Sequence, residues 1–169
     1  LVRFLVVMTF AMFIEKHAFS QPISIEWEHN YGGTNYDQSI DAISLIDSSF
    51  MVLNRSASVD GNVSVGKGST DFWLTKTNKN GELEWERTYG GGNSDYPQSI
   101  MSTFGGGFIL GGYTASNDVD ISINHGSYDC WIVKVDSSGN VEWELSIGGS
   151  SADALFSILP TKDSSFVFT

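Results

Sequence analysis

The stretch that decides the fold is residues 126–149, GSYDCWIVKVDSSGNVEWELSIGG, because residues 68–91 repeat its pattern as GSTDFWLTKTNKNGELEWERTYGG. The two stretches begin at Gly126 and Gly68, which defines a 58-residue period. The same interval separates three tryptophans, each between two glutamates: Trp27, Trp85 and Trp143. It also separates three aspartates: Asp37, Asp95 and Asp153. Self-similarity at a fixed period indicates a protein built from stacked structural repeats.

One period, taken from Asp95, predicts four strands: Gln98–Thr103, Gly107–Thr114, Cys130–Asp136 and Asn140–Ile147. Glycine-containing turns and one long loop, 115–128, separate them. The third strand is apolar on both faces, which is typical of a sheet stacked between neighbouring sheets. In the fourth strand charged and apolar residues alternate, which predicts a half-exposed strand at the outer edge.

These features predict an all-β protein, a β-propeller segment of four-stranded antiparallel blades over residues 21–169. A closing strand (Ile25–Tyr31), two full periods and the opening of a third give about two and a half blades. Propellers close with about 4–8 blades, so we expect the propeller to be incomplete. Gln38-Ser39-Ile40 recurs as Gln98-Ser99-Ile100, which predicts a two-residue shift between the first strands of the two repeats.

The first 20 residues differ from the rest and predict a signal peptide over 1–20. Arg3 precedes an apolar stretch from Phe4 to Ile14, and Ala18-Phe19-Ser20 offers small residues for cleavage before Gln21. The apolar stretch is too short to span a bilayer, so we expect no membrane span after cleavage. A buried N-terminal helix is the alternative interpretation.

Composition further limits the classes of partner and site that the chain is expected to have. The formal net charge of −11 argues against a nucleic-acid partner, because phosphate contacts need clustered lysine and arginine. The single cysteine, Cys130, excludes an intramolecular disulfide, and its apolar setting indicates a small buried side chain. The five tryptophans are interpreted as packing residues, with a carbohydrate-stacking platform as the alternative.

Two patterns could carry chemistry. The paired loop residues Asp60, Asn62, Asp118 and Asp120 offer oxygen donors at alternate positions, as calcium sites do, but the same residue types favour turns, which is the interpretation we prefer. The repeated Glu-Trp-Glu pairs would suit a glycosidase only if two carboxylates faced each other across a substrate. Both members lie on one strand and recur in every repeat, so the sequence predicts no catalytic residues and no cofactor beyond the calcium hypothesis.

Residues 126–136, together with Gly139, Trp143, Gly148-Gly149 and Gly106-Gly107-Phe108-Ile109, resemble the repeats of secreted proteins from Bacteroidetes, many of which end in a type IX secretion sorting domain. The resemblance covers about residues 25–169. It implies a secreted or cell-surface module, non-catalytic, that binds an extracellular glycan or protein. The alternative is an accessory propeller within a larger secreted polysaccharide-active enzyme. The turn-then-Trp element also resembles the docking motif of quinoprotein dehydrogenases, without a cofactor-specific set of residues.

Overall fold

The computed structural model describes residues 24–163 and 165–169 of the chain. Every regular element in these ranges is a β-strand, and the strands form two four-stranded sheets and one two-stranded sheet. No helix able to cross a membrane occurs in the same ranges. The signal peptide predicted over residues 1–20 lies outside them.

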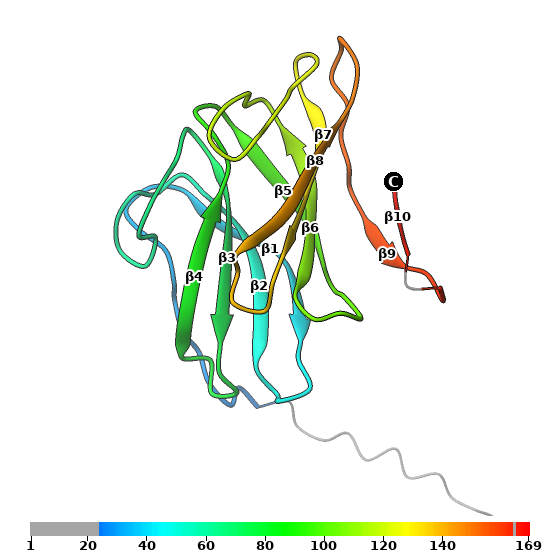
Figure 1. The fold of residues 1–169 in the computed structure, drawn as a ribbon. Coiled ribbons are helices and arrows are strands. Elements are labelled where there is room, and N and C mark those ends of the chain that lie inside the picture. Colours follow the sequence, from blue (N-terminus) through cyan, green and yellow to red (C-terminus); the bar gives the residue numbers. More distant parts are fainter. Residues whose placement is uncertain (1–23, 164) are drawn as a thin grey trace, which may run out of the picture.

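The sheets follow one another along the chain (Figure 1). The first contains β1 (Asp37–Ser44), β2 (Phe50–Ser56), β3 (Asp71–Thr77) and β4 (Leu83–Tyr89), in that order. The second contains β5 (Asp95–Ser102), β6 (Phe108–Thr114), β7 (Asp129–Val135) and β8 (Val141–Ile147), also in order. The third pairs β9 (Ile158–Pro160) with β10 (Phe166–Phe168). All strand pairs within the three sheets are antiparallel.

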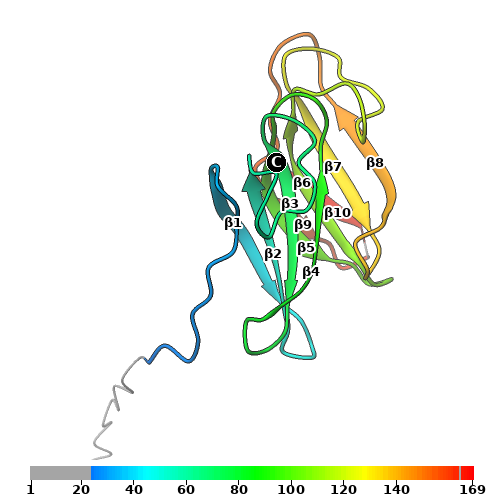
Figure 2. The ribbon, with the colours of Figure 1, turned by 90° about the vertical axis from the view of Figure 1, so that its left-hand side faces the viewer.

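The sheets stack face to face around two hydrophobic clusters. Side chains of the first and second sheets share one cluster, in which Phe72 and Trp131 meet edge to face with ring centroids 4.9 Å apart. A smaller cluster, with Ile109, Ile132 and Leu155, joins the second sheet to the third segment. Figure 2 shows the first two sheets side by side. The predicted segment of two and a half antiparallel blades is therefore confirmed.

The repeat period is strict in the strand register. Asp41 pairs with Leu53, and Ser99, one period after Asp41, pairs with Gly111 in the same way. Both first strands carry an irregularity just before this position, so each absorbs one extra residue in the same place. The predicted two-residue shift is wrong, because the similar tripeptides that suggested it occupy different positions in the two sheets.

A tryptophan of one repeat packs on a turn glycine of the next. A Cβ atom added to Gly139 would lie 3.1 Å from Cζ3 of Trp85, and one added to Gly81 would lie 2.5 Å from Cε3 of Trp27. Both glycines have a φ of 81°, a conformation that other residues rarely adopt. Nearby, Tyr89 Oη donates a hydrogen bond to the carbonyl of Gly139, 2.7 Å away. Each junction therefore needs a glycine at this place.

The predicted strand Ile25–Tyr31 is not a strand. Its side chains nevertheless occupy the position on the first sheet that those of β4 occupy on the second: Trp27 contacts Phe50, and Tyr31 Oη donates to Gly81 O at 2.5 Å. No described strand lies beside the segment to complete a ladder of backbone hydrogen bonds. It packs correctly but lacks strand geometry for that reason.

Four of the five tryptophans divide into two groups. Trp73 and Trp131, on the third strands, are 1% and 0% exposed, which confirms them as packing residues. Trp27 is 41% exposed because it belongs to a segment with no described strand beside it, and Trp143 is 40% exposed because the sheet that it faces has two strands. Both third strands are buried on both faces, as predicted.

The junctions also contain hydrogen bonds from side chains to the backbone of the next repeat. Asp41 Oδ2 accepts the backbone N–H of Ile100 at 2.9 Å, and Ser99 Oγ accepts that of Ile158 at 3.3 Å. These two contacts are equivalent, one period apart. They fix β5 against β1 and β9 against β5.

Among the residues that the structure describes, two other than glycine have positive φ: Ser48 at 65° and Val119 at 59°. The equivalent positions in the other repeat hold Gly106 (85°) and Gly61 (68°). The repeat therefore imposes the same backbone conformation whether or not a glycine is present. Val119 bears the greater steric strain, because its β-branched side chain is poorly tolerated at positive φ.

Candidate functional site

The four residues of the calcium hypothesis form two equivalent pairs in the long loops. Asp60 Oδ1 accepts the N–H of Thr34 at 2.8 Å, and Asp118 Oδ1 accepts that of Gly92 at 2.7 Å. Asn62 and Asp120, two residues further on, accept N–H groups of Gly32 and Gly90, respectively. All four side chains therefore hold the Gly-Gly turns in place. In the described ranges no group of three or more His, Cys, Asp or Glu side chains is arranged to hold a metal.

Two buried carboxylates face each other beside the turn that follows β4. Asp71 is 2% exposed and Asp95 is 0% exposed. A Cβ atom added to Gly90 would lie 2.2 Å from Asp71 Oδ1 and 2.7 Å from Asp95 Oδ2, so the two oxygens share the space beside this glycine. Asp95 accepts hydrogen bonds from Gly91 N–H and the Thr114 hydroxyl, whereas Asp71 Oδ1 has no partner.

Burial, with a smaller contribution from the neighbouring Asp95, raises the pKa of Asp71 to about 6, although hydrogen bonds from the backbone N–H groups of Lys67 and Gly68 oppose the rise. Burial also raises the pKa of Asp95. Lys67 is engaged elsewhere, in an ion pair with Asp120. Both carboxylates are buried at the junction and accept hydrogen bonds from neighbouring backbone N–H groups, so we interpret the pair as part of the packing between the sheets.

The repeated glutamates form hydrogen bonds and ion pairs within their own sheets. Glu86 and Glu144 accept the indole N–H of Trp73 and Trp131, each at 2.9 Å. Their neighbours two residues earlier, Glu84 and Glu142, form ion pairs with the lysines of the adjacent strand: Lys76 and Lys134, at 2.8 and 2.9 Å. These contacts account for the Glu-Trp-Glu pattern without a substrate.

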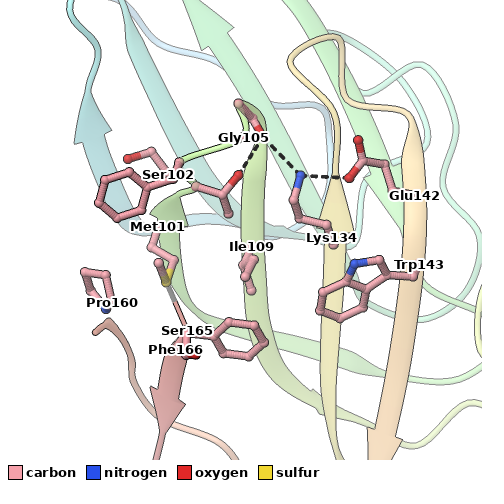
Figure 3. A pocket seen from close by; sticks show the side chains of 13 residues that line it. Met101, Ser102, Gly105, Ile109, Lys134, Glu142, Trp143, Pro160, Ser165 and Phe166 are labelled. Atoms are coloured by element: carbon pink, nitrogen blue, oxygen red, sulfur yellow. Dashed lines mark hydrogen bonds and ion pairs between the residues drawn. The ribbon is translucent and has the colours of Figure 1, made fainter. Parts of the chain in front are cut away.

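A cavity of about 290 Å³ lies between the second sheet and the third (Figure 3). Trp143 and Phe166 stack along it with ring centroids 6.2 Å apart, and Met101 and Ile109 complete its apolar wall. At the equivalent place in the preceding junction Phe108 is 5% exposed, because four strands stand behind it. The cavity is therefore space left between sheets where the third sheet has only two strands.

A second candidate surface is formed by side chains that are not shared between the repeats. Five aromatic side chains, here called the aromatic row, lie at the ends of the sheets where β1 and β5 begin: Tyr36, Tyr96, Tyr113, Tyr128 and Phe156. The strand register places Tyr96 opposite Tyr113, with ring centroids 5.1 Å apart. Tyr113 lies 5.6 Å from Tyr128 and 6.3 Å from Phe156, centroid to centroid.

Arg55 connects the first ring to the rest. Its guanidinium carbon lies 5.0 Å from the ring centroid of Tyr36 and 5.4 Å from that of Tyr96, within the range of cation–π contacts. The row thus extends from the first sheet, across the second, to the segment that leads into the third. It ends at Phe156, two residues before β9.

The aromatic row is accessible. Tyr36 is 54% exposed and Phe156 is 63% exposed, while the three central tyrosines are half-buried. Burial among these rings raises the pKa of Tyr128, and the neighbouring Tyr96 raises it as well. The central rings are held in place by one another, and the end rings present their faces to solvent.

The row is not part of the repeat. The positions one period away from its five members hold non-aromatic residues: Ser94, Gln38, Arg55, Thr70 and Gln98. Sequence analysis based on what the repeats share could not find it. The signal lies instead in the differences, because a strict alignment of the repeats shows aromatic residues replacing polar ones at five positions.

No protein-family model matches this chain, and no curated protein matches it.

Proposed function

We propose that this chain is a non-catalytic module, secreted or displayed on the cell surface, that binds a glycan through the aromatic row. The row itself carries the proposal. Five clustered aromatic side chains stand where the repeat otherwise has polar residues, and they extend from the start of β1, across the second sheet, to the segment before β9. A feature that contributes only to blade packing would be expected to recur from repeat to repeat, as the buried tryptophans do.

Tyrosine-rich surfaces suit sugars for physical reasons. The ring faces pack against the apolar C–H faces of a sugar, and the phenol groups exchange hydrogen bonds with its hydroxyls. The central rings already contact one another, so binding orders few side chains and loses little conformational entropy. The acidic charge of the chain argues against a nucleic acid as the stacking partner.

The extracellular setting rests on the predicted leader and on the resemblance to type IX-secreted repeat proteins. An accessory propeller within a larger secreted polysaccharide-active enzyme would use the same surface in the same way. A protein partner is the competing occupant of the row. The choice between glycan and protein is therefore an experimental one.

The test uses the purified chain against an array of neutral and acidic polysaccharides, followed by titration of any ligand found. Tyr36→Ala and Phe156→Ala remove exposed rings at the two ends of the row. Each is expected to weaken binding about two- to tenfold, corresponding to roughly 0.5–1.5 kcal/mol of lost stacking. Phe104→Ala is the matched control, because Phe104 is 82% exposed but lies in the β5–β6 turn at the opposite end of the sheets.

Binding that is weakened by both end variants and unchanged in the control supports the proposal. Absence of binding to every glycan would overturn it. So would glycan binding that Phe104→Ala weakens as much as the row variants do, because the ligand would then contact another surface.

A further inference from the structure

A cationic side chain, that of Arg55, packs against two rings of the aromatic row. Arg55, on β2, is half-buried between the rings of Tyr36 and Tyr96. Its Nη2 donates hydrogen bonds to Tyr36 Oη and Gln38 Oε1, each at 2.9 Å, and both acceptors are neutral. The guanidinium is therefore fixed in direction, with no negative charge supplied by these contacts.

The charge of Arg55 is not balanced within the described part of the chain. It forms no ion pair there, its Nη1 makes no hydrogen bond there, and its Nε is buried without a partner. Three lysines of the same sheets, by contrast, are each paired with a carboxylate: Lys67, Lys76 and Lys134. Partly buried charges are normally paired, so an unpaired guanidinium in a chain of net charge −11 is unusual.

We propose that the aromatic row is specific for an acidic glycan and that Arg55 receives the anionic group of one of its sugars. This inference rests on the proposed glycan-binding function. A guanidinium binds carboxylate and sulfate oxygens through charge-assisted, directional hydrogen bonds, and Nη1 is the donor available for them. A sugar stacked on Tyr36 or Tyr96 brings its ring substituents next to this donor, because the two rings flank it.

The net negative charge of the chain limits how many charged groups a bound glycan can carry. One cation in an acidic protein favours a ligand that presents one carboxylate or sulfate at this point, and long-range repulsion opposes a densely charged polymer. Short acidic oligosaccharides are therefore the appropriate probes.

The experiment measures binding of trigalacturonate and trimannuronate, their methyl esters, and a sulfated galacto-oligosaccharide together with its unsulfated parent. Each ester keeps the sugar framework and removes the charge, so the acid–ester comparison isolates the contribution of the anion. The wild-type chain is expected to bind one of the acidic probes at least about tenfold more tightly than its uncharged counterpart. The two uronates and the sulfated probe distinguish a carboxylate from a sulfate as the anion.

Arg55→Gln is expected to abolish the acid preference, so that acid and ester bind with equal affinity, whereas Arg55→Lys should retain part of the preference. Should Arg55→Gln fail to fold, the acid–ester comparison on the wild-type chain decides the question alone. Equal affinity for acid and ester, or binding confined to neutral glycans, overturns the inference and leaves the proposed function standing. No binding to any glycan overturns both.

Discussion

Replacing Asp71 by asparagine is expected to stabilise the protein at neutral pH and to remove part of its pH dependence. Asp71 Oδ1 is buried without a partner and faces Asp95, while Oδ2 accepts the N–H groups of Lys67 and Gly68 at 2.7 and 3.2 Å. An asparagine in the same rotamer can keep its oxygen toward these N–H groups. Its NH2 group then replaces Oδ1 and donates to Asp95.

The magnitude follows from the pKa. Burial raises the pKa of Asp71 from the ordinary value of 3.8 to about 6, so the folded state binds the proton more tightly than the unfolded state. The stabilisation from this proton is complete below pH 3.8 and is lost as the pH rises through about 6. Over that window the wild type loses up to about 3 kcal/mol relative to a neutral side chain. Asp71→Asn should therefore gain up to that amount at pH 7.5 and little at pH 4.

Urea denaturation at pH 4.5, 5.5, 6.5 and 7.5, followed by tryptophan fluorescence, measures the difference in free energy of unfolding between variant and wild type. Asp136→Asn is the control of opposite sign, since hydrogen bonds from Asn140 hold the pKa of Asp136 below its usual range. Any effect of the control should be a loss of stability that fades as the pH falls. An Asp71→Asn variant that is less stable than wild type at pH 7.5, or whose difference is constant with pH, would refute the reasoning.

Two further predictions concern the repeat itself. Val119→Gly should stabilise the protein by roughly 0.5–1 kcal/mol in thermal or urea unfolding, because relief of a positive φ outweighs the added flexibility of glycine; Gly61→Val, the reverse change one period earlier, should destabilise it. Trp131→Ala should lower the free energy of unfolding by about 3–5 kcal/mol, since the ring is fully buried, whereas Trp143→Ala, at 40% exposed, should cost less than half as much. Equal losses for the two tryptophans would contradict the assigned sheet stacking.

The fold could be predicted from the sequence because the features that specify it lie close together along the chain and recur in each repeat. The repeat period, the turn glycines and the strand alternation can each be read along the chain, and they located the four strands of the second sheet to within three positions at either end. Two expectations were wrong for physical reasons. The similar tripeptides at 38–40 and 98–100 were mistaken for equivalents, and Ile25–Tyr31 has strand composition but no neighbouring strand among the described residues.

The candidate site could not be predicted from the sequence in the same way. Tyr96 and Tyr113 face each other only through antiparallel pairing, and Arg55 reaches Tyr96 from the first sheet. Patterns along the chain cannot show such contacts before the register is known. The loop carboxylates, which the sequence did single out, hold turns through backbone N–H groups, as the preferred interpretation expected.

Three of the hydrogen bonds between repeats run from a side chain of one repeat to a backbone atom of the next: Tyr89 to the carbonyl of Gly139, Asp41 to the amide of Ile100, and Ser99 to the amide of Ile158. Every residue type except proline supplies both backbone groups, so a neighbour can change the side chains at these positions without losing the three hydrogen bonds. Duplicated repeats joined in this way are free to diverge on their solvent-facing positions while continuing to stack. Natural selection could thus assemble a ligand-binding surface from one repeat at a time, with the others preserving the fold.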